Sequence, residues 1–170
     1  MKKPNPISEE LIAPCGMNCA ICSRYLAHVN KLKRSQCIGC RPRNKRCTYL
    51  FKNCTGPRNI SKGNAAFCFE CKEYPCKQID RIDKRYRIGY EMSMKDNLEY
   101  IRKKGMAKFI EEQYKKYHCP KCFGLISIHN GKCFNCDTIT RLVEKRTTEV
   151  KRTTRMTAAK TKKRVTRKTA

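Results

Sequence analysis

The sequence contains no tryptophan and few other aromatic residues, with six Phe and eight Tyr among 170 residues. It is also poor in acidic residues, because 14 Asp and Glu stand against 40 Lys and Arg, for a formal charge of +26. No stretch approaches the roughly 20 apolar residues that a membrane span needs, and no apolar run of signal-peptide length follows Met1. These absences predict a soluble, cytoplasmic chain without a large apolar core, and the charge favours polyanionic partners.

Sequence motifs of the common enzyme classes are absent as well. No HExxH, GxxxxGK[ST], GxGxxG or GxSxG element occurs, which removes the usual metalloprotease, nucleotide-binding and hydrolase interpretations. The three histidines, His28, His118 and His129, are more typical of packing or surface residues, because cysteines suffice to fill every metal site. We therefore predict no catalytic residue and no organic cofactor, and the question of enzymatic activity leans towards no.

Cysteine, by contrast, is abundant, with 14 residues that include five CxxC pairs. Two thiolates at this spacing can bind one tetrahedral metal ion. Disulfides are the competing explanation, but they belong to oxidising compartments, and no secretion route is visible. The pattern predicts a metal-stabilised protein that binds two or three zinc ions.

The most specific ligand set is formed by two CxxC pairs near the end of the cysteine-bearing region. Ten residues separate the pairs, and they include Asn130-Gly131, a strong hairpin-turn signal that follows a predicted strand over Leu125 to Ile128. Two knuckles at the ends of a β-hairpin resemble a zinc ribbon. The predicted ligands are Cys119, Cys122, Cys133 and Cys136.

The first ten cysteines can be partitioned in more than one way. One plausible site joins Cys19 and Cys22 with Cys37 and Cys40, and a second site joins Cys47, Cys54, Cys68 and Cys71, with Cys15 and Cys76 as alternates. An iron–sulfur cluster held by Cys15, Cys19, Cys22 and Cys76 is the alternative, since thiolates suit such clusters as well as zinc. The first three of these have the spacing of radical S-adenosylmethionine enzymes, but no strand–helix alternation of barrel length accompanies it.

Apolar periodicity predicts four helices. One begins near Cys22, and a second begins at Pro75 as its first residue. A third opens at Ser93, with Asp96 as a capping-box-like partner, and stops at Gly105. The fourth runs over residues 106–117, so the fold class expected is a small metal-stabilised α+β protein.

Basic residues concentrate in one loop and in the C-terminal segment. Eleven basic residues against Glu149 alone give residues 145–170 a charge of +10. Without aromatic residues or an apolar face this tail is predicted to be disordered and to bind phosphates with little sequence specificity. We expect a cysteine-rich region over 1–118, a ribbon over 119–137 and a basic tail over 138–170. The candidate nucleic-acid contacts are Arg41, Arg43, Lys45, Arg46, Lys151, Arg152, Lys162, Lys163 and Arg164.

Several of these motifs together resemble an uncharacterised cysteine-rich family of prokaryotic proteins. The resemblance covers residues 11 to 136 and depends on four stretches: Cys15-Gly-Met-Asn-Cys-Ala-Ile-Cys, Cys37-Ile-Gly-Cys-Arg, Phe67-Cys-Phe-Glu-Cys-Lys-Glu-Tyr-Pro-Cys and Ser93-Met-Lys-Asp-Asn-Leu. It implies a metal-binding fold, with zinc as the expected metal, in archaea and anaerobic bacteria, and it carries no agreed activity.

Three functions from different classes follow. The first is a non-catalytic zinc-binding module that associates with nucleic acid, RNA or a ribonucleoprotein, through its basic loops and tail. The second is an iron–sulfur redox protein, and the third is an adaptor that binds a protein partner through its ribbon. The content of iron, sulfide and zinc separates the first two, and resistance of complexes to nuclease and salt separates the third.

Overall fold

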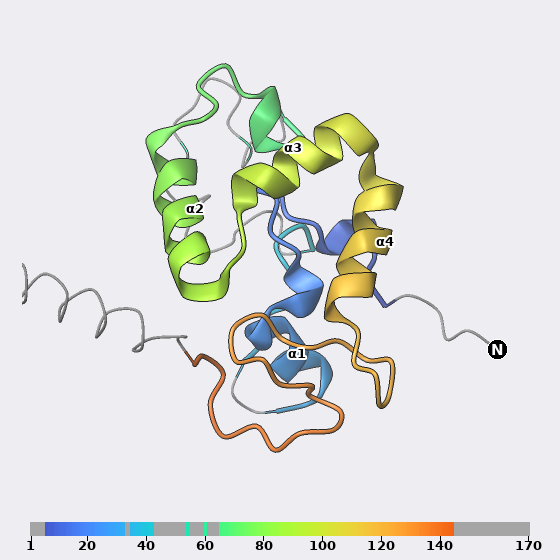
Figure 1. The fold of residues 1–170 in the computed structure, drawn as a ribbon. Coiled ribbons are helices and arrows are strands. Elements are labelled where there is room, and N and C mark those ends of the chain that lie inside the picture. Colours follow the sequence, from blue (N-terminus) through green and yellow to red (C-terminus); the bar gives the residue numbers. More distant parts are fainter. Residues whose placement is uncertain (1–5, 33–34, 43–53, 55–59, 61–64, 145–170) are drawn as a thin grey trace, which may run out of the picture.

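A computed structural model describes residues 6–32, 35–42, 54, 60 and 65–144. These residues contain four α-helices and three short 3-10 helices (Figure 1). Their strand content is limited to isolated antiparallel bridges, so the helical part of the expected fold is confirmed and the β part amounts to single residue pairs. The elements are η1 (Glu9–Leu11), η2 (Cys19–Ile21), α1 (Ser23–Val29), η5 (Cys68–Glu70), α2 (Lys77–Tyr90), α3 (Met94–Lys104) and α4 (Met106–Tyr117).

Local capping signals explain the bounds of the last two helices. The Ser93 hydroxyl accepts a hydrogen bond from the Asp96 backbone N–H at 3.0 Å, which caps α3 as expected. Gly105, at φ +83°, ends α3 and precedes the first residue of α4. The Asp96 carboxylate accepts a hydrogen bond from Arg87 at 2.7 Å, so it ties α3 to α2. Both predicted helices are confirmed, because their stop and start signals are local in sequence.

The first two α-helices begin later than expected. Helix α2 starts at Lys77 with Cys76 as its N-cap, two residues beyond Pro75. Helix α1 has seven residues and follows η2, so the segment after Cys19 first forms a 3-10 turn. In both places a cysteine lies at the junction between a turn and a helix.

A continuous apolar core joins the amino-terminal cysteine region to α2, α3 and α4. Its fully buried side chains include Ile12 and Ile21 from the first region and Ile79, Leu98 and Phe109 from the three helices. Burial of each such side chain contributes about 1.5 to 3 kcal/mol. The cysteine-rich region therefore shares a hydrophobic core with the helices, although the sequence lacks tryptophan.

Gly16 fixes the contact between the first loop and α3. It has φ +82°, and a Cβ at this position would lie 2.6 Å from the backbone oxygen of Met94. The Asn97 side chain donates to the Gly16 carbonyl at 2.8 Å. Only glycine satisfies both the positive φ and the close backbone approach.

A buried carboxylate links α2 to α3. Asp83 accepts hydrogen bonds from the Ser93 hydroxyl at 2.7 Å, the Lys95 backbone N–H at 3.0 Å and the Arg87 Nε at 2.7 Å. Burial raises the pKa of Asp83, but these three donors outweigh burial and hold the pKa below its usual value. The ion is thus satisfied inside the interface between the helices.

No helix in the described ranges combines the length and apolarity needed to cross a lipid bilayer.

Candidate metal centre

A tight loop positions the first cysteine pair directly after α4. The Cys119 N–H donates to the Gly124 carbonyl at 2.7 Å, and the Phe123 N–H donates to the Cys119 carbonyl at 2.8 Å. Phe123 adopts a left-handed backbone, with φ +60°. These reciprocal hydrogen bonds fold the CxxC segment back on itself, so that Cys119 and Cys122 lie on the same side of the loop.

The second pair comes from the chain segment after the Asn130-Gly131 turn. The Ser127 N–H donates to the Lys132 carbonyl at 2.9 Å, and the Gly131 N–H donates to the Ser127 carbonyl at 2.9 Å. Single bridges pair His118 with Leu125 and Ile126 with Cys133. The turn therefore brings the second CxxC segment alongside the first.

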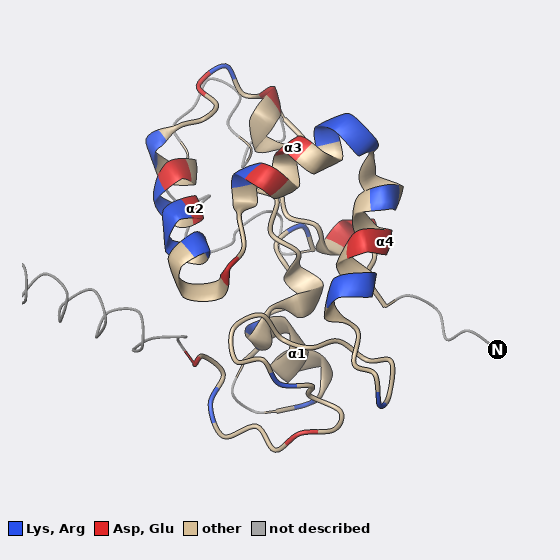
Figure 2. Cartoon of the chain, in the orientation of Figure 1, with Lys and Arg blue, Asp and Glu red and all other residues tan. Residues whose placement is uncertain are grey.

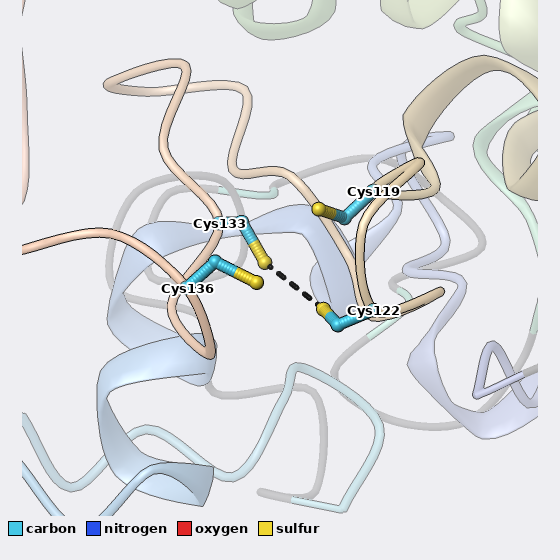
Figure 3. A group of neighbouring side chains, drawn as sticks. All are labelled: Cys119, Cys122, Cys133 and Cys136. Carbon is cyan, nitrogen blue, oxygen red and sulfur yellow. Dashed lines mark hydrogen bonds between the residues drawn. The ribbon is translucent and has the colours of Figure 1, made fainter.

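All four sulfur atoms converge in this arrangement (Figure 3). The sulfur atoms of Cys119, Cys122, Cys133 and Cys136 lie within 4.8 Å of one another, and those of Cys122 and Cys133 are 3.6 Å apart. A tetrahedral ion with metal–sulfur bonds of about 2.3 Å requires sulfur–sulfur edges of roughly 3.8 Å. A disulfide, at about 2.05 Å, is much shorter. The four cysteines could therefore hold a metal ion.

Backbone N–H groups stabilise negative charge on the sulfur atoms. The Gly124 N–H donates to the Cys122 sulfur at 3.4 Å. This hydrogen bond, followed by one from the Cys136 thiol, lowers the pKa of Cys122 to about 7. Contact with Cys122 raises the pKa of Cys136, because a neighbouring thiolate disfavours a second negative charge. A bound cation would remove that repulsion and allow all four ligands to ionise.

Close approach of the two knuckles requires a small residue at position 124. A Cβ on Gly124 would lie 2.7 Å from Asn135 Nδ2 and 3.3 Å from the Cys122 sulfur. On the other knuckle, the Asp137 carboxylate accepts from the Cys133 N–H at 2.8 Å. These contacts orient the ligands from outside the set of four sulfurs, as metal sites generally require.

A buried histidine attaches this unit to the helices. His129 is 7% exposed, and its Nδ1 accepts a hydrogen bond from the Ser23 backbone N–H at 3.2 Å. The proton of the neutral ring therefore resides on Nε2, which donates to the Tyr86 hydroxyl at 2.9 Å. Burial, together with the charges of Arg85 and Arg24, lowers the pKa of His129 to about 4. The ring stays neutral at pH 7 and joins α1, α2 and the C-terminal unit, which agrees with the packing role expected for it.

The amino-terminal cysteines are placed differently. Within the described part of the chain, the C-terminal set is the one group of three or more Cys, His, Asp or Glu side chains whose ligand atoms lie within 4.8 Å of one another. Cys47 lies outside the described residues. Cys15, Cys19 and Cys40 are buried, and the half-buried cysteines of this region are Cys22, Cys37, Cys54, Cys68, Cys71 and Cys76.

Of the candidate nucleic-acid contacts, Arg41 alone lies in the described ranges. Its Nε donates to the Ile12 carbonyl at 2.6 Å, and its Nη2 donates to the Ala66 carbonyl at 3.0 Å. Its guanidinium also lies over the Phe67 ring, 4.8 Å from the centroid. Arg41 thus joins two loops, a role that sequence spacing does not reveal. The remaining candidates, Arg43, Lys45, Arg46, Lys151, Arg152, Lys162, Lys163 and Arg164, fall outside the described residues.

Charged side chains on the helices are of both signs. Figure 2 shows Lys and Arg along α2, α3 and α4, with Asp and Glu among them. Several of the acidic groups form ion pairs, such as Asp80 with Lys95 at 2.8 Å and Glu99 with Arg102 at 2.7 Å. The large cationic excess of the chain therefore resides mainly in its basic loop and its last 26 residues.

The fold and the four-sulfur centre define a small, cysteine-rich helical protein that could bind a metal ion. Residues 11–81 match the model of a protein family of unknown function, DUF3795. This confirms, for those residues, the resemblance to an uncharacterised cysteine-rich family. No curated protein and no solved structure matches the chain. The matched range contains the first ten cysteines, whereas the C-terminal centre lies beyond it.

Proposed function

We propose that this protein is a non-catalytic zinc-binding module that associates with nucleic acid, RNA or a ribonucleoprotein. The observation that carries the zinc proposal is the convergence of four cysteine sulfurs within 4.8 Å. Four thiolates complete the tetrahedral coordination of zinc, so no position remains for a substrate or an activated water molecule. Such an ion supports structure and does not perform chemistry.

Zinc is favoured over an iron–sulfur cluster at this centre because of the sulfur spacing. The 3.6 Å separation between Cys122 and Cys133 suits two ligands of a single ion. A cluster of several irons holds its cysteine sulfurs further apart, because each sulfur binds a different iron. Thiolate ligands in tetrahedral geometry are typical of zinc in proteins.

The ion would compensate for a shortage of apolar packing between residues 119 and 137. Here Leu125 and Phe134 are the buried large apolar side chains, with 6% and 9% exposure. Below roughly 70 to 80 residues a hydrophobic core alone rarely stabilises a fold, and metals commonly supply the difference. Metal binding to such a unit is therefore coupled to its folding.

Purification without oxygen and without added metal tests the zinc proposal. We expect colourless protein that contains zinc and neither iron nor inorganic sulfide. Brown protein with iron and sulfide would support instead the redox function assigned to Cys15, Cys19, Cys22 and Cys76. Zinc content and the absence of that colour can be measured on the same sample.

Association with nucleic acid is supported by the charge of the sequence. The formal charge is +26, and residues 145–170 contribute +10 of it. Lys and Arg side chains that contact phosphates release counterions, which gives affinity without sequence specificity. The tail has no aromatic residue, so base stacking does not contribute to its binding.

A salt titration with single-stranded RNA tests this part. The variant replaces the 11 Lys and Arg of residues 145–170 by Gln, which keeps the length of the chain. We expect weaker binding and a salt slope reduced by about 0.7 for each phosphate that the variant no longer neutralises. An unchanged slope would remove the tail from the mechanism, and protein partners that stay bound after nuclease and high salt would favour the adaptor function.

A further inference from the structure

A second CxxC turn resembles the turns of the C-terminal centre. In η5 the Cys71 N–H donates to the Cys68 carbonyl at 3.1 Å, and in the C-terminal centre the Cys136 N–H donates to the Cys133 carbonyl at 3.3 Å. The shared hydrogen bond closes the same four-residue turn. Figure 3 shows that such a turn directs both of its sulfurs towards one point at Cys133 and Cys136.

The chain after this turn brings a third cysteine to a helix terminus. The Tyr74 N–H donates to the Cys71 carbonyl at 3.1 Å, which forms a second turn. Cys76 is then the N-cap of α2, a helix of 14 residues, where unpaired backbone N–H groups and the helix dipole favour a thiolate. Figure 1 shows the short loop that connects η5 to α2.

Three cysteines act electrostatically on Cys68. Burial is the main cause that raises the pKa of Cys68, and the nearby thiols of Cys54, Cys76 and Cys71 raise it further, to about 12. Each of the three is therefore close enough to repel a thiolate at Cys68. A bound divalent cation is the group that would permit these thiols to ionise together.

The backbone around Cys68 is held firmly. Its N–H donates to the Pro14 carbonyl at 2.8 Å, which joins η5 to the first loop. The rings of Phe67 and Phe69 stack on each other with a centroid distance of 5.3 Å. Cys68 is therefore a fixed anchor to which the other cysteines can be drawn.

From this arrangement we propose that Cys54, Cys68, Cys71 and Cys76 form a second binding site for a thiophilic divalent ion such as Zn²⁺. Their sulfurs are not all within 4.8 Å of one another, so the ion draws the set together when it binds. The assignment differs from the sequence-based partition, which placed Cys47 in this site and left Cys76 as an alternate. It does not depend on the C-terminal centre, so either site can exist without the other.

Zinc stoichiometry in matched serine variants of the full chain tests the assignment. We expect Cys76→Ser to lose one equivalent of zinc relative to the unmodified protein, and Cys47→Ser to keep the full amount. Cys122→Ser should lose a different equivalent, so the losses in the double variant Cys76→Ser/Cys122→Ser should add. Retention of zinc by Cys76→Ser together with loss from Cys47→Ser would overturn the proposal.

Thiol protection in the unmodified protein provides a measurement that needs no variant. With Zn²⁺ bound, Cys54, Cys68, Cys71 and Cys76 should resist alkylation, and a chelator should release all four at the same rate. Mass spectrometry of the peptides follows each position. Rapid alkylation of Cys76 in the zinc-loaded protein, with Cys68 and Cys71 protected, would exclude Cys76 as a ligand.

Discussion

Two regions of this molecule carry the same CxxC motif, but they differ in what else holds them in place. Residues 119–137 have four converged sulfurs and two large buried apolar side chains, Leu125 and Phe134. The first region contributes Ile12, Ala20 and Ile21, all at 0% exposure, to a core shared with the helices. Equal motifs therefore do not imply equal dependence on metal. The C-terminal unit should need its ion to fold, and the first region should keep its packing against α3 without one.

Loss of a C-terminal ligand should have the largest effect on this comparison. Cys122→Ser leaves three sulfurs and removes the ligand that accepts the Gly124 N–H. We expect loss of the ion and destabilisation of residues 119–137 by more than about 4 kcal/mol, because loss of a metal is among the few severe single changes. Metal analysis and hydrogen exchange of this segment measure both.

The matched control is Lys121→Ser, an exposed position in the same knuckle. It should keep the ion and change the free energy of unfolding by less than about 0.5 kcal/mol. If Cys122→Ser behaves like Lys121→Ser, the four-sulfur centre does not stabilise this unit.

Acid should weaken the junction between the two regions through His129. Its pKa in the folded protein is about 4, below the usual 6.5, so the unfolded chain binds the proton first as the pH falls. The stability that the neutral ring provides is complete above pH 6.5 and is lost as the pH approaches 4, by up to about 3 kcal/mol.

Urea unfolding between pH 7.5 and 4.5 measures this loss, with His129→Gln as the comparison. Protonation of the cysteine ligands affects both proteins, so the difference in their pH dependence reports on the histidine alone. Parallel pH profiles would show that His129 does not couple the regions.

A pair of glycine substitutions sharpens the contrast with a smaller effect. Gly16 and Gly131 both have positive φ, at +82° and +67°, but only Gly16 faces a backbone oxygen, that of Met94. Gly16→Ala should cost about 2 to 3 kcal/mol and leave the C-terminal zinc bound, whereas Gly131→Ala should cost about 1 kcal/mol. Thermal unfolding with parallel zinc analysis checks this order. Equal costs would mean that the first loop does not depend on its contact with α3.

The features that sequence predicts well here are those encoded over a few residues. Ser93 and Gly105 mark the ends of α3 because a cap needs only its neighbouring N–H groups or a positive φ. The four C-terminal ligands are predictable because the Asn130-Gly131 turn fixes the distance between two CxxC pairs.

Other features depend on contacts between distant residues, which spacing does not encode. The sequence predicts phosphate contacts for Arg41, yet in the structure it binds the carbonyls of Ile12 and Ala66. His129 meets Ser23, 106 positions away in sequence, and nothing in the motif around it indicates that partner. The partition of the first ten cysteines is of the same kind, because their neighbours are set by tertiary packing.

Hydrogen exchange of the full chain, with and without a zinc chelator, tests the central claim most directly. The informative amides are those of Cys119, Ile126 and Ser127, which donate backbone hydrogen bonds inside the C-terminal unit or from it to Tyr117 at the end of α4. We predict that they lose most of their protection when the ion is removed, while the amides of α3 and α4 keep theirs. Full protection of residues 119–137 in the metal-free protein would contradict the account.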